Sequence, residues 1–177
     1  MALQSKTISS QTTSNGYTLV LELTEDSTSL TGNTSSVSWK LKLKSGANNS
    51  FSTYAIGWEI VLNGTQVSYQ ARDGAPRLSL TYNSSLTLAS GTSKISHNSD
   101  GELSMSVKAS IDMASVSYTP GPLSLSGTMN LTKINRGLIY IDNGSKLEAY
   151  QVFIDNGTSW DQYIPHIDNG SSWDQYG

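Results

Sequence analysis

Apolar and polar residues alternate with a period of two through nearly the whole chain of 177 residues. In the clearest run, Val37, Trp39, Leu41 and Leu43 are separated by a serine and by lysines. Successive side chains of a strand point to opposite faces of a sheet, so this pattern predicts one buried and one solvated face. Serine and threonine make up 48 of the 177 residues, but the regular alternation argues against a disordered Ser/Thr-rich stalk.

About seven or eight such segments follow one another within residues 1–137, with turn signals such as Asn63-Gly64 between them. This spacing predicts an all-β fold, an antiparallel β-sandwich of the Ig-like or jelly-roll-like kind, and makes a closed barrel less favoured. The predicted strands lie within residues 17–23, 37–44, 58–62, 67–69, 78–82, 86–95, 103–111 and 123–131.

Residues 138–177 carry a repeat of 13 residues. Ile-Asp-Asn-Gly occurs at 141–144, 154–157 and 167–170, and an apolar residue and a tyrosine follow at matching positions. Asn-Gly tolerates positive φ, so each copy predicts a tight primed turn between short strands. We therefore expect a sandwich domain of residues 1–137 and a C-terminal array of three hairpin repeats at 138–177. The predicted turn residues are Asn143, Gly144, Asn156, Gly157, Asn169 and Gly170.

The C-terminal array is rich in aromatic and acidic residues. It has two tryptophans, four tyrosines and a net charge of −5, whereas residues 1–137 have a net charge of +2. A single hairpin is marginal in water, so we expect these aromatic rings to pack on a partner. Contacts with other hairpins or protein chains are the favoured interpretation, and a sugar-binding surface is the alternative. The candidate interaction residues are Trp160, Tyr163, Trp173, Tyr176, Asp161 and Asp174.

Few residues offer catalytic chemistry. The chain has no cysteine, and its two histidines, His97 and His166, lie in different regions. In His97-Asn98-Ser99-Asp100-Gly101 we expect a structural turn, in which Asp100 binds nearby backbone and Gly101 supplies the bend. No catalytic residue and no enzymatic activity are therefore predicted.

The acidic pair Glu25-Asp26 is predicted to lie in a solvated turn at a strand end, rather than to form half of a glycosidase acid pair. No EF-hand loop, phosphate-binding loop or dinucleotide motif is present, so no metal site and no cofactor are expected. The acidic array would repel phosphate backbones, which argues against nucleic acid as a partner. No apolar run is long enough for membrane insertion, and no secretory signal is visible, so we expect synthesis in the cytoplasm.

Three segments resemble a domain of unknown function in structural proteins of tailed phages, namely siphophages and prophages of Gram-positive bacteria. These segments are residues 58–64 (WEIVLNG), 91–101 (GTSKISHNSDG) and 125–136 (LSGTMNLTKINR). The C-terminal array is similar to the Ile-Asp-Asn-Gly-Ser-Ser-Trp-Asp repeats at the C-termini of such proteins. The first repeat departs from that pattern, because Lys146-Leu147 stands in place of Ser-Trp.

The resemblance implies a virion component, made in the host cytoplasm, of the tail tip, baseplate, neck or a fibre. The implied partners are other virion proteins and further copies of the chain. The alternative is an adhesion module that recognises carbohydrate on the host surface. The resemblance implies no catalytic residues.

Overall fold

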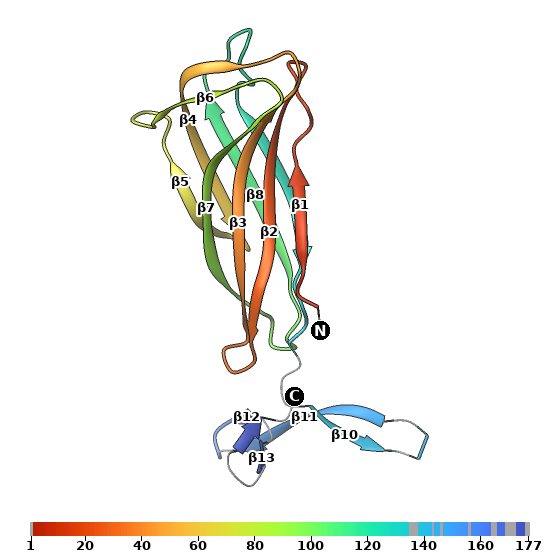
Figure 1. The fold of residues 1–177 in the computed structure, drawn as a ribbon. Helices are drawn as coiled ribbons and strands as arrows, with labels where there is room; N and C mark the ends of the chain where they lie inside the picture. Colours follow the sequence, from red (N-terminus) through yellow and green to blue (C-terminus); the bar gives the residue numbers. More distant parts are fainter. Residues whose placement is uncertain are drawn as a thin grey trace.

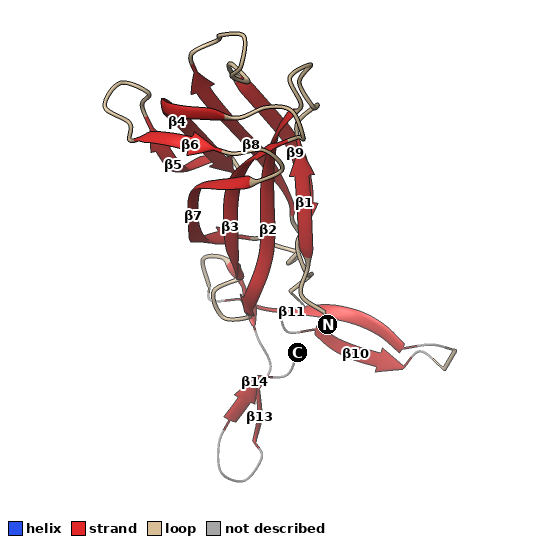
Figure 2. Ribbon diagram, turned by 45° about the horizontal axis from the view of Figure 1, so that its top comes forward, coloured by secondary structure: helices blue, strands red, loops and turns tan. Residues whose placement is uncertain are grey.

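The computed structural model describes residues 2–134, 138–142, 144–145, 147–155, 157–163, 166–168 and 173–175. All regular elements in these ranges are strands, as Figure 2 shows. Within the same ranges there is no helix with the length and hydropathy needed to cross a membrane.

Nine strands form two antiparallel sheets that face each other (Figure 1). The first sheet has the order β1-β2-β3-β7 and contains β1 (Ser5–Ser9), β2 (Tyr17–Ser29), β3 (Thr34–Ser45) and β7 (Ser85–Ser96). The second has the order β5-β4-β8-β9 and contains β4 (Phe51–Leu62), β5 (Thr65–Gln70), β8 (Ser104–Met113) and β9 (Leu123–Asn130). A further strand, β6 (Arg77–Leu80), pairs with the first half of β4.

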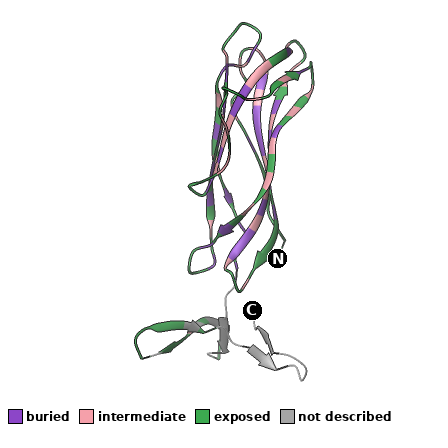
Figure 3. Cartoon of the chain, turned by 90° about the vertical axis from the view of Figure 1, so that its left-hand side faces the viewer, coloured by how far each residue is buried: buried purple, intermediate pink, exposed green. Residues whose placement is uncertain are grey.

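The core lies between the two sheets and follows the alternation seen in the sequence. Leu41 and Leu43 of the first sheet and Ile60 and Leu62 of the second are fully buried, and Figure 3 shows buried and exposed positions alternating along the strands. Burial of each such side chain contributes about 1.5–3 kcal/mol relative to exposure. The predicted antiparallel β-sandwich is confirmed.

The structure confirms one local prediction for this domain and adds one strand that the sequence pattern did not indicate. The hairpin at Asn63-Gly64 is confirmed: Leu62 pairs with Thr65, and φ is +47° at Asn63 and +81° at Gly64, as a type I′ turn requires. Strand β1 was not predicted. It is an edge strand in which only Ile8 is buried, so it lacks an apolar alternation.

The C-terminal strands form sheets of their own. One sheet has the order β10-β11-β12, with β10 (Leu138–Asp142), β11 (Leu147–Asp155) and β12 (Trp160–Tyr163). The other pairs β13 (His166–Asp168) with β14 (Trp173–Gln175). The predicted hairpin repeats are confirmed, and the domain boundary at residue 137 stays a prediction because residues 135–137 lie outside the described ranges.

All three repeats turn in the same register. The last pair before each turn is Asp142 with Leu147, Asp155 with Trp160, and Asp168 with Trp173. Four residues therefore separate the paired positions, and the prediction of a tight primed turn is wrong for the array, because such a turn has a two-residue loop. In the second repeat the Gly157 N–H donates to Asp155 Oδ1 at 2.8 Å. This hydrogen bond ties the start of the loop to the last residue of the preceding strand.

Candidate functional site

The sheet β10-β11-β12 carries large apolar side chains on both faces. In the pairing of β11 with β12, Val152 lies opposite Tyr163 and Asp155 lies opposite Trp160, and directly paired residues share a face. Tyr150, Ile154 and Tyr163 therefore lie on one face, and Phe153 and Trp160 lie on the other. All five side chains are exposed, and Trp160 is the most exposed of them at 69%.

The structure describes the side chains of some predicted interaction residues but not of others. Trp160, Asp161 and Tyr163 lie on β12 and are exposed, and Ser159 Oγ donates to Asp161 Oδ1 at 3.1 Å. Trp173 and Asp174 lie on β14, but their side chains are outside the described part of the structure.

Tyr176 lies outside the described residues, as do four of the predicted turn residues: Asn143, Asn156, Asn169 and Gly170. Gly144 and Gly157 both have φ of +86°, a conformation that glycine adopts readily, within four-residue loops rather than the predicted tight primed turns.

The turn predicted at residues 97–101 is confirmed. Asp100 Oδ1 accepts a hydrogen bond from the Glu102 N–H at 3.0 Å, and Gly101 has φ of +77°. The Gly101 N–H donates to the Asn98 carbonyl at 2.9 Å. His97 at the start of this loop, between β7 and β8, is buried.

A second cluster, which the sequence did not predict, is centred on Glu25. This residue lies in β2 and is fully buried, so the prediction of a solvated turn is wrong for Glu25, although Asp26 is exposed. The Glu25 carboxylate accepts hydrogen bonds from Ser35 Oγ at 2.6 Å, from Thr132 Oγ1 at 2.6 Å and from the Gln4 N–H at 3.2 Å. The Thr132 N–H also donates to it, at 3.1 Å.

The sequence did contain a signal for this cluster. Glu25 continues the alternation of Leu19, Leu21 and Leu23 on the buried face of β2, and Ser35 is in phase with Val37 on β3. A buried polar residue needs partners, so an acid in phase with the core residues predicts a polar cluster. Its partners come from distant segments, which the alternation alone does not identify.

Ser35 connects Glu25 to His97. Ser35 Oγ lies 2.7 Å from His97 Nε2, and His97 Nδ1 lies 2.8 Å from the Gly101 carbonyl oxygen. A carbonyl only accepts, so Nδ1 carries a proton. Ser35 has one proton for two neighbours. Either it donates to an ionised Glu25 and accepts from a doubly protonated His97, or it donates to His97 and accepts from a protonated Glu25.

In both arrangements, Glu25 and His97 together carry one proton more than an ionised glutamate and a neutral histidine would. Burial is the largest influence on the Glu25 carboxyl and raises its pKa, but the hydrogen bonds from Ser35, Thr132 and Gln4 together outweigh burial and lower the pKa. This direction favours the ionised form of Glu25, with Ser35 donating to it. The cluster resembles a catalytic triad in composition, but Ser35 is fully buried within a strand and has no access to a substrate.

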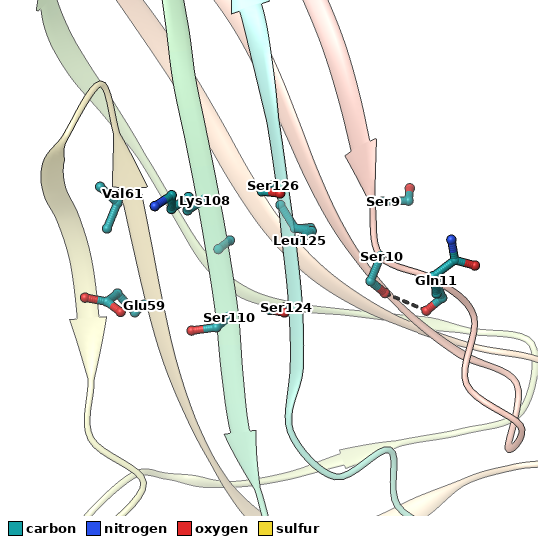
Figure 4. Close-up of a pocket in the computed structure, with 11 residues that line it drawn as sticks. Ser9, Ser10, Gln11, Glu59, Val61, Lys108, Ser110, Ser124, Leu125 and Ser126 are labelled. Carbon is teal, nitrogen blue, oxygen red and sulfur yellow. Dashed lines mark hydrogen bonds between the residues drawn. The ribbon is translucent and has the colours of Figure 1, made fainter.

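An open groove of about 480 Å³ lies on the outer face of the second sheet (Figure 4). Glu59 of β4, Lys108 of β8, and Ser124 and Ser126 of β9 line it, together with Ser10. No aromatic ring is among its lining residues, so this groove offers hydrogen bonds but no stacking surface. Across the described residues, no three His, Asp or Glu side chains are grouped closely enough to hold a metal ion.

Comparison with protein families gives a match over most of the chain. The family described as "Siphovirus protein of unknown function (DUF859)" matches residues 9–159, which include most of the sandwich and the first two repeat turns. The comparisons with curated proteins and with solved structures give no match. The family match supports the resemblance to phage proteins that the segments at 58–64, 91–101 and 125–136 carry. The chain belongs to this family of siphovirus proteins.

Proposed function

We propose that the chain is a structural component of the phage virion and that its C-terminal hairpin array joins it to other copies of itself. The observation that carries this proposal is the exposure of large apolar side chains on both faces of β10-β11-β12. Large apolar side chains exposed together on one small sheet are typical of interaction sites, and tryptophan and tyrosine are enriched in protein interfaces.

A thin sheet with two apolar faces gains stability by association. One face would bury Tyr150, Ile154 and Tyr163 against a neighbour, and the other face would bury Phe153 and Trp160. Short isolated hairpins are marginal in water, so a neighbouring array would stabilise this sheet. A ring of identical subunits satisfies this requirement for every copy.

Charge supports an interaction between different parts of neighbouring copies. The array carries a net charge of −5, whereas the outer face of β3 presents Lys40, Lys42 and Lys44. One acid on the adjoining strand, Glu22, accepts a hydrogen bond from Lys42 at 2.7 Å. Complementary charge of this kind favours encounter in one orientation.

We also propose that the role is not enzymatic. The Ser35–His97 pair places a hydroxyl within hydrogen-bond distance of an imidazole, as a serine nucleophile and its base would be, but both residues are buried. Turnover of purified bacterial cell wall by the protein would contradict this proposal.

The position in the virion and the host are part of the same proposal. The repeats at 141–144, 154–157 and 167–170 resemble those of proteins from phages of Gram-positive bacteria, in the tail tip, baseplate, neck or fibre. Mass spectrometry of purified virions, followed by labelled antibodies in electron microscopy, tests this position. Absence of the chain from purified virions would overturn the virion role.

The assembly proposal is tested by measuring the mass of the full chain in solution by light scattering. We expect an oligomer, and we expect the Phe153→Ala/Trp160→Ala variant to dissociate. Tyr69→Ala is the matched control, because Tyr69 is an exposed aromatic residue on β5 of the sandwich. Urea unfolding of each variant confirms that the sandwich remains folded.

Three results would contradict assembly through the array. They are a monomeric wild-type protein at tens of micromolar, an unchanged mass for the double variant, and equal dissociation of Tyr69→Ala. A double variant that keeps its mass but loses binding to host cells would instead support the alternative, in which the array binds host carbohydrate.

A further inference from the structure

Four loops meet at one end of the sandwich, the end at which β9 begins, which is at the top of Figure 1. They connect β1 with β2, β3 with β4, β6 with β7, and β8 with β9, and they comprise residues 10–16, 46–50, 81–84 and 114–122. We call them the distal loops. They contain no Asp, Glu, Lys or Arg, although 14% of the whole chain is charged.

Hydrogen bonds between the distal loops join them into one surface. Asn15 Nδ2 donates to the Ser117 carbonyl at 3.2 Å, and the Gly46 N–H donates to the Gly16 carbonyl at 2.9 Å. The Asn83 N–H then donates to the Gly46 carbonyl at 3.1 Å. Loops from both sheets are therefore held to one another, and this pre-organisation lowers the entropy cost of binding a ligand.

The loop at 114–122 is also fixed internally. Thr119 is buried, its Oγ1 donates to the Ala114 carbonyl at 2.6 Å, and the Val116 N–H donates to the same Oγ1 at 3.0 Å. Pro120 and Pro122 restrict the backbone beyond it. This loop therefore presents the side chains of Val116 and Tyr118 from a rigid support.

Tyrosines provide the exposed rings of this surface. Tyr82 is 58% exposed and Tyr118 is 49% exposed. Both lie near the fully buried Tyr17: its hydroxyl donates to the Tyr118 carbonyl at 2.7 Å, and burial together with the nearby Tyr82 raises its pKa. Tyr54 Oη donates to Tyr118 Oη at 2.8 Å, and the two rings make an edge contact with centroids 5.9 Å apart. The Tyr118 ring is thus anchored at one edge and exposed at the other.

We infer that the distal loops form a binding site for a neutral carbohydrate, such as an uncharged polysaccharide of a cell surface. Exposed tyrosine rings offer apolar faces to sugar rings, and amides and hydroxyls both donate and accept, as sugar hydroxyls require. A surface without charged side chains gives no counter-charge to phosphate or carboxylate groups, so the site selects against anionic polymers.

The composition of the distal loops supports the same inference. Tyrosine, serine, asparagine and glycine on loops held by a rigid sandwich are the residues that recognition surfaces use, because rigid rings give contact area and small polar groups give adaptable hydrogen bonds. This inference uses residues of the sandwich alone, so it does not depend on assembly through the C-terminal array. If copies do assemble, several weak sites would act together on a repeating polymer.

The test is binding of the full-length protein to an array of defined oligosaccharides. Neutral members contain glucose, galactose, rhamnose or N-acetylglucosamine, and matched members carry phosphate or carboxylate groups. We expect binding to at least one neutral member and a loss of about tenfold or more in affinity for Tyr82→Ala/Tyr118→Ala, as removal of central aromatic contacts gives. Tyr69→Ala is the control, because that exposed ring lies on β5 outside the distal loops.

Tyr118→Phe is a second variant for the case in which the alanine variant unfolds. It removes the hydroxyl that accepts from Tyr54 but keeps the ring, and we expect it to retain most of the binding. The inference is overturned if no neutral member binds, if only anionic members bind, or if the double alanine variant binds as well as Tyr69→Ala. The Phe153→Ala/Trp160→Ala variant separates the two proposals. If this variant is monomeric but each monomer still binds the neutral oligosaccharide, the distal loops bind sugar independently of assembly through the array.

Discussion

The Glu25 carboxylate accepts hydrogen bonds from both the backbone N–H and the side-chain hydroxyl of Thr132, a residue 107 positions later in the chain. Thr132 follows β9 and is among the last described residues before the C-terminal array. The Ile134 N–H also bonds the Gly101 carbonyl, at 2.9 Å, and this carbonyl faces His97 Nδ1 as well. The buried cluster therefore holds the segment at which the chain leaves the sandwich.

The first prediction concerns the stability that this cluster contributes. Glu25→Ala leaves the N–H groups of Thr132 and Gln4 without their acceptor in a buried place, so we expect a loss of about 3 kcal/mol in the free energy of unfolding. Glu22→Ala on the same strand removes a partly exposed ion pair with Lys42, and its cost should be about 1 kcal/mol or less. Urea unfolding of both variants measures the difference. Equal losses would show that Glu25 has no special structural role.

The second prediction concerns acid. The ordinary glutamate pKa is 4.5, and the pKa of folded Glu25 is lower because its hydrogen bonds outweigh burial. A lowered folded-state pKa gives stability that is present above the unfolded pKa and is lost as the pH falls through the folded-state pKa. The gap in unfolding free energy between wild type and Glu25→Gln should therefore narrow as the pH falls below about 4.5.

Glu22 also has a lowered pKa, chiefly through its hydrogen bond with Lys42, so it contributes to the acid response of both proteins equally. Comparing the two proteins at each pH removes this contribution. A gap that stays constant from pH 7 to about pH 3 would mean that Glu25 is not the carboxylate whose protonation weakens the fold.

The third prediction distinguishes two reasons why a position requires glycine: a positive φ, and a neighbouring atom that leaves no room for a Cβ. Gly101 and Gly64 have similar φ, +77° and +81°, but a Cβ at Gly101 would overlap the Ile134 carbonyl, whereas a Cβ at Gly64 meets nothing within 4 Å. Gly64→Ala should cost about 1–2 kcal/mol for its backbone conformation alone. Gly101→Ala should cost clearly more, because the exit segment must shift. Equal midpoints in urea unfolding would contradict this steric account.

The fourth prediction concerns Trp39, whose ring covers Gly91 on the neighbouring strand. A Cβ at Gly91 would lie 2.6 Å from Trp39 Cζ2, so Gly91→Ala should displace the indole, weaken its hydrogen bond to Ser93 and cost about 1–3 kcal/mol. Gly127→Ala is the control, because the nearest atom to its Cβ would be the terminal Cδ1 of Ile8, at 3.0 Å, and this flexible side-chain end can move. A change in tryptophan fluorescence for Gly91→Ala alone is the expected result.

Local features of the protein follow directly from its sequence. The alternation in residues such as Val37, Trp39, Leu41 and Leu43 predicts strands and their buried face, because side-chain direction along a strand depends only on the parity of the position. The hairpin at Asn63-Gly64 and the positive φ of Gly144 and Gly157 are also encoded locally, since tolerance of positive φ is a property of these residue types. The four-residue length of the repeat loops was missed, because loop length depends on strand pairing.

Which polar residues come into contact depends on how the strands pair and how the two sheets stack. Glu25, Ser35, His97 and Thr132 come from four segments, and only the pairing and stacking of the two sheets brings them within hydrogen-bond distance. The distal loops converge for the same reason, because strands of both sheets end at one end of the sandwich. Contacts between distant segments depend on sheet order and register, which the parity of a single strand does not encode.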